Sequence, residues 1–277
     1  MSVGEWREWV GLFHSVAPNR VTMQMRGMEP RELIYSLMDP TGGYVESQVP
    51  IEFKGSLEAR VGPMYSGKSW WLIFKYRELH NAKRTVRAFK PGVDTRDEGI
   101  FSRGNGGTSV PCTLLNNENM ASEIDRLLID RVQAVVIDEL HFLDNAYAFC
   151  YLLKALGICV YVAYLDGTFK QREFDNTKNL FSIINEYEKL PAICYDCPYG
   201  INQKACNTIK YKMDDGRHRD HLTSSMSDED DRVPHVGGEE KYIAVCDRCL
   251  LQYKLGNRHY SSSSSRASGD EASDDSA

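Results

Sequence analysis

The 277-residue sequence predicts an α/β fold in which a mainly parallel sheet is flanked by helices, followed by a smaller cysteine-bearing domain. Between residues 56 and 190, apolar runs typical of buried strands alternate with segments of helical length. Two Cys-x-x-Cys pairs follow between residues 191 and 255. We therefore expect an N-terminal extension (1–55), the α/β domain (56–190), the cysteine domain (191–255) and a disordered, Ser-rich acidic tail (256–277). A polar stretch at about 214–232 is expected to be a disordered insertion in the cysteine domain.

The predicted elements of the α/β domain follow in a regular order. Leu57, Ala59 and Val61 alternate with polar neighbours, which predicts a first strand, and the run from Trp70 to Leu79 has helical length. Further strands are expected at 86–89, 134–139 and 158–165, and further helices at 122–128 and 146–156. This alternation indicates parallel strands joined by helical crossovers.

A glycine-bearing loop lies between the first strand and the first helix and fits the pattern G-x-x-x-x-G-K-[ST]. Its residues are Gly62, Pro63, Met64, Tyr65, Ser66, Gly67, Lys68 and Ser69. The two glycines let consecutive N–H groups point at phosphate oxygens, Lys68 can reach the β- and γ-phosphates, and Ser69 can ligate Mg²⁺. The motif predicts ATP binding. Alone it leaves a motor, a switch and a kinase open.

The strand expected at 134–139 ends in two carboxylates. Asp138 would lie beside the phosphate loop and hold Mg²⁺ directly or through water. Glu139 is suited to accept a proton from an attacking hydroxyl or to position a water. The run from Asp138 to His141 also spells a helicase box, but a helicase needs a second nucleotide-binding domain. Only about 110 residues separate His141 from the last cysteine pair, which is too few.

The cysteines predict a metal site. Cys194 and Cys197 form one pair and Cys246 and Cys249 the other. Four thiolates suit a closed, structural Zn²⁺ site without an open position, so we assign the metal no catalytic role. The other four cysteines are expected to be small buried apolar residues.

Composition limits the other function classes. Apolar content of 42% and charged content of 26% are ordinary for a globular protein, and the net charge of −6 is mild evidence against coating nucleic acid. No basic patch interleaved with aromatics surrounds the cysteines, which disfavours a zinc-ribbon nucleic-acid binder. The sequence lacks an 18-residue apolar run and a signal-like N-terminus, so we expect no membrane span and a cytoplasmic location.

Taken in order, these motifs resemble the thymidine kinase family of the cellular and poxvirus type, P-loop kinases with a zinc-bound lasso domain. The resemblance runs from about 57 to 253. The matching stretches are 62–69, Lys90 with Asp94 and Arg96, 137–139 with Phe142, 165–174, both cysteine pairs, 236–238 and 241–242.

The resemblance implies transfer of the γ-phosphate of ATP to the 5′-hydroxyl of deoxythymidine, giving dTMP for DNA synthesis. Glu139 would be the general base, Ser69 and Asp138 would hold Mg²⁺, and Asp94 and Arg96 would join the loop in binding ATP. The positions that match those enclosing the nucleoside are Met64, Phe142, Leu165, Phe169, Phe174, Thr208, Val236, Gly237, Gly238 and Tyr242. A homo-oligomer, tetramer or dimer, is implied as well.

Four positions depart from the family pattern. Trp70 replaces a Thr, His141 a Gln, Arg103 a His and Lys210 an Arg. With the long extensions, these departures indicate a divergent, viral member of the family, located in the host cytoplasm. They also keep an alternative open, a nucleotide-binding regulatory protein on the same fold that has lost turnover.

Overall fold

The computed structural model describes residues 55–95, 99–102, 107–210, 213–214, 217–218 and 242–255, with backbone alone at 213–214 and 217–218. The N-terminal extension up to residue 54, most of the polar insertion and the tail lie outside these residues. So do Arg96, Arg103 and the 236–238 stretch. Among the described residues, none of the helices has both the length and the apolar character needed to cross a bilayer.

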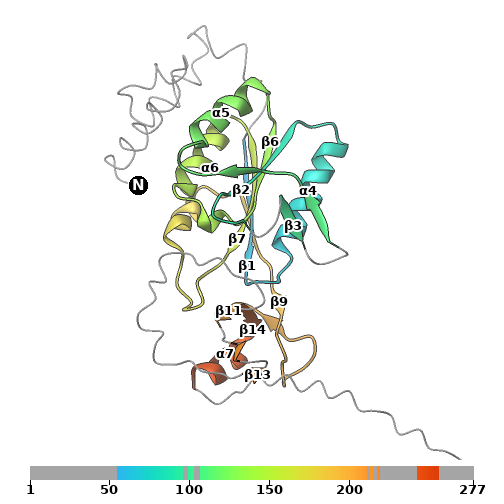
Figure 1. The fold of residues 1–277 in the computed structure, drawn as a ribbon, viewed down its shortest axis with the longest axis vertical. Helices are drawn as coiled ribbons and strands as arrows, with labels where there is room; N and C mark the ends of the chain where they lie inside the picture. Colours follow the sequence, from blue (N-terminus) through green and yellow to red (C-terminus); the bar gives the residue numbers. More distant parts are fainter. Residues whose placement is uncertain are drawn as a thin grey trace, which may run out of the picture.

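A six-stranded sheet forms the centre of the molecule, and all of its strand pairs are parallel (Figure 1). The strand order is β5-β2-β6-β7-β1-β8. The strands are β1 (Leu57–Gly62), β2 (Val86–Pro91), β5 (Thr113–Leu115), β6 (Ala134–Ile137), β7 (Cys159–Leu165) and β8 (Glu186–Lys189). The predicted α/β class with a parallel sheet is confirmed.

Helices cover both faces of this sheet. Helix α4 (Lys68–Asn81) and the antiparallel pair β3 (Ile100–Ser102) and β4 (Thr108–Val110) pack on one face. Helices α5 (Met120–Ile129) and α6 (Ala146–Ala155) pack on the other face. The 3₁₀ turns are η1 (Leu140–Phe142), η2 (Asp175–Thr177) and η3 (Leu180–Ser182).

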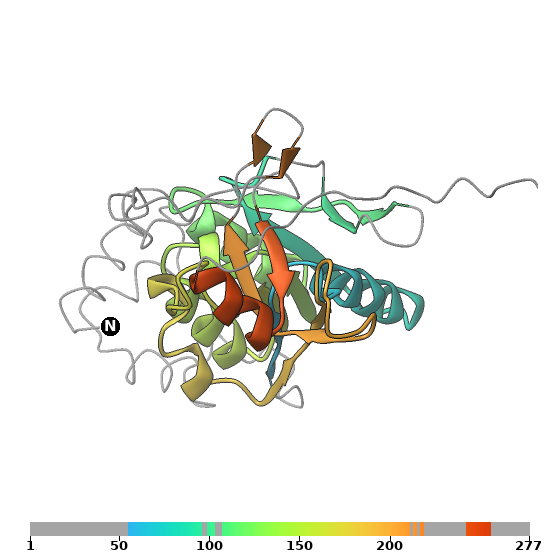
Figure 2. The same cartoon turned by 90° about the horizontal axis from the view of Figure 1, so that it is seen from below.

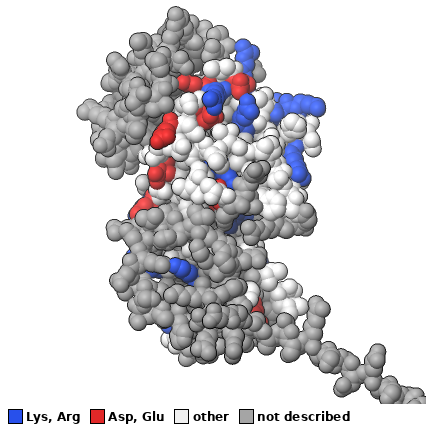
Figure 3. Space-filling model, in the orientation of Figure 1, with Lys and Arg blue, Asp and Glu red and all other residues white. Residues whose placement is uncertain are grey.

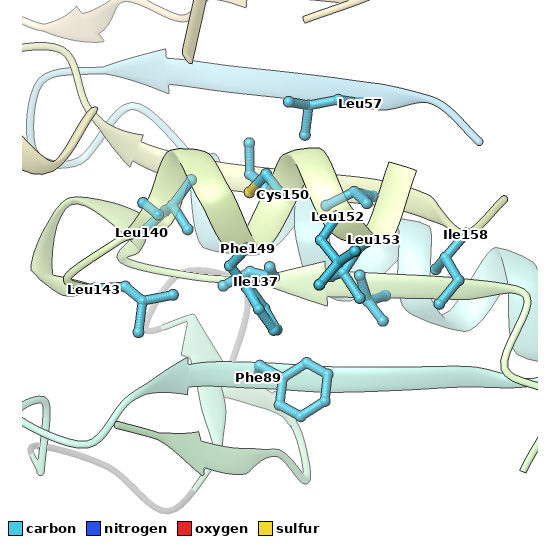
Figure 4. Close-up of a cluster of buried hydrophobic side chains, with 14 of the residues drawn as sticks. Leu57, Phe89, Ile137, Leu140, Leu143, Phe149, Cys150, Leu152, Leu153 and Ile158 are labelled. Atoms are coloured by element: carbon cyan, nitrogen blue, oxygen red, sulfur yellow. The ribbon is translucent and has the colours of Figure 1, made fainter. Parts of the chain in front are cut away.

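Strand β6 shows why the sheet is buried on both sides. Val135 and Ile137 join the core under α5 and α6, whereas Ala134 and Val136 join the core under α4. Successive strand residues point to opposite faces, so an unbroken apolar run is what a doubly covered strand requires. Figure 4 shows Ile137 among the α6 side chains, with Phe89 of β2 below them.

The outer strand β8 carries charge along an exposed edge. Arg60 of β1 pairs with Glu186 at 2.6 Å and with Glu188 at 2.7 Å, and its guanidinium lies 4.8 Å from the ring centre of Trp71. Charged side chains on an edge strand disfavour pairing with other chains. Strand β8 was not predicted from the sequence because its residues show no apolar alternation.

The cysteine region is built from two small antiparallel pairs and a helix. Strand β9 (Ala192–Ile193) pairs with β10 (Lys204–Ala205), and β11 (Asn207–Lys210) pairs with β14 (Tyr242–Val245). Helix α7 (Asp247–Lys254) follows β14, and Figure 2 shows it beside β11 and β14. Strands β12 (Met213–Asp214) and β13 (Arg217–His218) also pair, at the start of the stretch for which no regular structure was expected.

Charge of both signs is spread over the described part of the face in Figure 3. Lys and Arg lie mainly on the α4 side of this face, and Asp and Glu mainly on the side of α5 and α6. The described residues on this face therefore do not form the continuous basic surface that nucleic-acid coating requires.

Candidate active site

The phosphate loop connects β1 to α4 through an unusual backbone. Gly62 has φ +155°, and a Cβ at this position would lie 2.2 Å from the backbone oxygen of Leu190. Gly67, with φ +84°, immediately precedes the first residue of α4, and Tyr65 also has a positive φ of 64°. The first turn of α4 contains no acidic residue, so the positive end of its dipole is available to an anion.

Lys68 is enclosed by the loop that precedes it. Its Nζ donates to the backbone oxygen of Pro63 at 2.6 Å and to Oγ of Ser66 at 3.2 Å. Burial lowers the pKa of Lys68, while the negative charges of Glu139, Asp138 and Asp166 oppose that shift. The ammonium group therefore faces carboxylates that follow β6 and β7, at the end of the sheet where the loop lies.

Asp138 follows β6, and the hydroxyl of Ser69 lies close enough to its carboxyl to favour the ionised form. Burial and the neighbouring charge of Glu139 raise the pKa of Asp138 to about 7, although Ser69 and Lys68 act in the opposite direction. A divalent cation between Ser69 and Asp138 would restore the ionised form, because a nearby positive charge favours the carboxylate. The two side chains suit Mg²⁺, which binds oxygen ligands.

Glu139 lies where the chain turns from β6 into η1. Its backbone is left-handed, with φ 50° and ψ 38°, which is uncommon for a residue other than glycine. Its N–H donates to Oδ1 of Asp138 at 3.0 Å, and its side chain is 20% exposed. The carboxylate is thus beside the Ser69–Asp138 pair and still reachable from outside.

Three ring side chains, those of His141, Phe142 and Phe174, pack together next to Glu139. The ring of His141 is 4.2 Å from that of Phe142 and 4.6 Å from that of Phe174, centre to centre. The N–H of Leu165 donates to Nδ1 of His141 at 3.4 Å. Three of the residues that the resemblance assigns to the nucleoside, Phe142, Leu165 and Phe174, therefore gather around one histidine.

The other described nucleoside positions meet where the phosphate loop touches the cysteine region. Oγ1 of Thr208 accepts a hydrogen bond from the N–H of Met64 at 3.1 Å. The hydroxyl of Tyr65 donates to the backbone oxygen of Tyr242 at 3.3 Å. The rings of Tyr242 and Phe169 lie 6.3 Å apart.

Gln171 links these groups, although no role was predicted for it from the sequence. Its Nε2 donates to the backbone oxygens of Phe169 at 2.8 Å and Thr208 at 3.2 Å. It sits in a tight turn in which the N–H of Thr168 donates to the oxygen of Arg172 at 2.8 Å, and its own φ is 57°. A glutamine with a left-handed backbone cannot be recognised from a single sequence.

Lys90 and Asp94 are both buried at the carboxyl end of β2. The N–H of Asp94 donates to the oxygen of Pro91 at 3.0 Å, which closes the turn after the strand. Burial raises the pKa of Cys112, on which Lys90, Asp138 and Asp94 all act electrostatically. Lys90, Asp94 and Asp138 therefore all lie near Cys112. Arg96, Val236, Gly237 and Gly238 lie outside the described residues.

The four predicted zinc ligands form one cluster. The sulfur atoms of Cys194, Cys197, Cys246 and Cys249 all lie within 4.8 Å of one another. Sγ of Cys197 is 4.0 Å from that of Cys246 and 3.7 Å from that of Cys249. Thiolates at about 2.3 Å from a tetrahedral Zn²⁺ lie about 3.8 Å apart, so the cluster fits zinc.

Comparison with known proteins decides the family. The family model described as thymidine kinase matches residues 55–250. The chain belongs to the thymidine kinase family. It is 28% identical over 209 residues to the cytosolic thymidine kinase of Bos taurus, covering 75% of this chain and 76% of the relative. It is 31% identical over 198 residues to a thymidine kinase of Pseudothermotoga lettingae, covering 70% and 94%. It is 31% identical over 218 residues to one of Ureaplasma parvum, covering 76% and 88%.

Three departures of this thymidine kinase family member are visible in the structure. Trp70 is 43% exposed and stacks on Phe74, with ring centres 5.7 Å apart. Nζ of Lys210 lies 5.5 Å from the ring centre of Phe169. His141 is fully buried beside Glu139. Nε2 of His141 lies 3.6 Å from Oε2 of Glu139, the carboxylate that the resemblance assigns to the chemistry.

Proposed function

We propose that the protein is a thymidine kinase that transfers the γ-phosphate of ATP to the 5′-hydroxyl of deoxythymidine, giving dTMP and ADP. The observation that carries the proposal is the meeting of a phosphate loop with a carboxylate pair, in which Asp138 lies near Ser69 and Lys68 and accepts a hydrogen bond from the N–H of Glu139. Membership of the thymidine kinase family supports the choice of acceptor.

The phosphate loop would bind the donor. The N–H groups of the loop and the dipole of α4 would hold the phosphates, and Lys68 would lie against the γ-phosphate. Asp94 and Arg96 would contribute to ATP binding at the end of β2. Ser69 and Asp138 would hold Mg²⁺, which neutralises the charge of the transferred phosphate when it is bound.

Two sets of residues would enclose the acceptor nucleoside. Phe142, Leu165 and Phe174 lie on the Glu139 side, and a second set lies on the side of the cysteine region. That second set consists of Met64, Phe169, Thr208, Tyr242 and the backbone of 236–238. Flat apolar surfaces that converge with a few polar groups are typical of sites for small aromatic ligands.

Glu139 would act as general base. Its carboxylate would accept the proton of the 5′-hydroxyl as the hydroxyl oxygen bonds to the γ-phosphorus and the bond to the ADP oxygen breaks. Lys68 and the loop N–H groups would neutralise charge on the transferred group, so most of the acceleration would come from positioning and electrostatics.

The cysteine cluster would have a structural role. Cys246 directly follows β14, and its N–H donates to Sγ of Cys194 at 3.1 Å. A Zn²⁺ at this cluster would fix the ends of the strands that carry Thr208 and Tyr242. The metal would thus stabilise the acceptor side of the site without touching a substrate.

The proposal is tested by a nucleoside panel. Purified, zinc-containing protein is incubated with ATP·Mg²⁺ and thymidine, deoxyuridine or deoxycytidine, and the monophosphates are separated by chromatography. We expect dTMP as the main product. Tight ATP binding without a monophosphate from any nucleoside would overturn the proposal and support the alternative of a nucleotide-binding regulatory protein.

We also propose a homo-oligomer, tetramer or dimer, in the cytoplasm, as the family resemblance implies. Light scattering coupled to size-exclusion chromatography measures the mass of the assembly. A mass of about 31.5 kDa, that of one chain, would contradict the oligomer.

A further inference from the structure

His141 is held in place from several directions. It lies in η1, two residues after Glu139, and is fully buried. Its ring contacts those of Phe142 and Phe174, and Nδ2 of Asn176 donates to its backbone oxygen at 3.1 Å. The orientation of the imidazole is therefore set by its surroundings.

One contact determines which ring nitrogen carries the proton. The N–H of Leu165 donates to Nδ1 of His141 at 3.4 Å. A nitrogen that accepts a hydrogen bond has no proton of its own, so the neutral ring carries its proton on Nε2. Nε2 lies 3.6 Å from Oε2 of Glu139. The donor atom of the imidazole thus faces the carboxylate.

The distance is slightly too long for a hydrogen bond in this state. Catalytic hydrogen bonds are often long in the absence of substrate and shorten when it binds. Glu139 has room for such an adjustment because its side chain is 20% exposed, whereas His141 does not. The left-handed backbone of Glu139 is costly and persists only where its surroundings enforce it.

We propose that His141 is a positioning residue whose Nε2–H holds Oε2 of Glu139, leaving Oε1 to accept the proton of the 5′-hydroxyl. The inference rests on the proposed function, in which Glu139 is the base. His141 itself takes no proton in the reaction: the proton passes from the hydroxyl to Glu139, and the imidazole stays neutral. Its contribution is to the orientation of the carboxylate.

Two conservative variants separate the two ring nitrogens. His141→Asn retains an acceptor near the position of Nδ1 for the N–H of Leu165 but has no donor near Nε2. His141→Gln can place its amide N–H₂ near the position of Nε2 and so retains the donor toward Glu139. A role that depends on Nε2–H predicts opposite outcomes for the two.

The experiment is steady-state kinetics with thymidine and ATP·Mg²⁺ on both variants and the wild type. We expect His141→Asn to lower kcat about 10- to 100-fold, the loss expected for a hydrogen bond to a charged group, with the KM for thymidine changed less than about threefold. We expect His141→Gln to stay within about threefold of wild type in kcat. His80→Asn, on the exposed end of α4, is the matched control and should leave both constants unchanged.

A double-mutant comparison distinguishes positioning from a general loosening of the fold. In the Glu139→Gln background the imidazole has no carboxylate to orient, so adding His141→Asn should change the residual rate less than about twofold. Equal rates for wild type and His141→Asn would overturn the inference. So would a second loss of the same size in the Glu139→Gln background. A wild type that phosphorylates no nucleoside would overturn the proposed function, and this inference with it.

Discussion

The hydroxyl of Thr208 accepts a hydrogen bond from the backbone N–H of Met64, which lies 144 residues earlier in the chain, at 3.1 Å. Thr208 belongs to β11 of the cysteine region, and Met64 belongs to the phosphate loop. The bond from the hydroxyl of Tyr65 to the oxygen of Tyr242 makes the same connection. The loop proposed to bind the donor is therefore tied to the region proposed to hold the acceptor.

Replacing Thr208 tests this tie. Thr208 is buried, so Thr208→Val preserves shape but leaves the N–H of Met64 without its acceptor, which costs about 1–3 kcal/mol. We expect the KM values for both ATP and thymidine to rise, and Thr208→Ser, which keeps a hydroxyl, to resemble wild type. A Thr208→Val enzyme with both KM values unchanged would show that the bond does not shape the site.

The cysteine cluster should hold about one Zn²⁺ per chain. Cys246→Ser removes a ligand and should abolish stoichiometric zinc, lower the melting temperature and weaken ATP binding through the loop contacts. Cys206→Ser is the matched control because Cys206 is outside the cluster and, contrary to the burial expected from the sequence, exposed. Metal analysis by mass spectrometry, with calorimetry for ATP, makes the comparison. Zinc-free wild type purified without chelator would refute the metal site.

The two loop glycines should differ in their tolerance of a methyl group. A Cβ on Gly62 would meet the oxygen of Leu190 at 2.2 Å, whereas a Cβ on Gly67 meets nothing within 4 Å. Gly67→Ala should cost only the left-handed backbone strain, about 1–2 kcal/mol. Gly62→Ala should cost more than about 3 kcal/mol, because the backbone itself must move. Thermal or urea unfolding measures both, and equal losses would contradict this packing.

Asp138 should make stability depend on pH. Its pKa in the folded protein is about 7, above its ordinary value of about 3.9. A raised carboxyl pKa contributes stability that is complete below about pH 4 and is lost as the pH rises through about 7. Without Mg²⁺ or nucleotide, Asp138→Asn should therefore gain stability relative to wild type between pH 5 and pH 8. We expect a gain of about 1–2 kcal/mol, or roughly 2–8 °C.

Melting curves at both pH values check this expectation, and a pH-independent difference between Asp138→Asn and wild type would contradict it. The same variant should lose the stabilisation that ATP·Mg²⁺ gives the wild type, because the proposed metal ligand is gone. A residue that costs stability in the empty site and is needed by the ligand is typical of functional positions.

The buried strands of the sheet and the helices that cover its two faces were predictable from the sequence. The run of four apolar residues in β6 predicted a buried strand, and the phosphate motif located the start of α4. The strand order was not predictable, since nothing local places β7 between β1 and β6. Strand β8 was missed because its residues are all exposed and its pairing with β1 depends on backbone bonds and on Arg60.

The candidate site was predictable where a motif fixes geometry and unpredictable where the fold brings distant parts together. The motif indicated that Lys68 and Asp138 would meet, and both lie in one electrostatic cluster. The contact of Thr208 with Met64 and the link through Gln171 depend on how the cysteine region docks. The orientation of His141 depends on the N–H of Leu165, a backbone group that carries no sequence signal.

Glu139 is proposed to take the proton of the 5′-hydroxyl of thymidine. The most direct measurement is the rate of dTMP formation from ATP·Mg²⁺ and thymidine by wild type and by Glu139→Gln, which keeps the size of the side chain but cannot act as the base. We predict that wild type forms dTMP and that the variant is about 10²- to 10⁴-fold slower, with ATP binding retained. Equal rates in the two proteins would show that Glu139 is not the base.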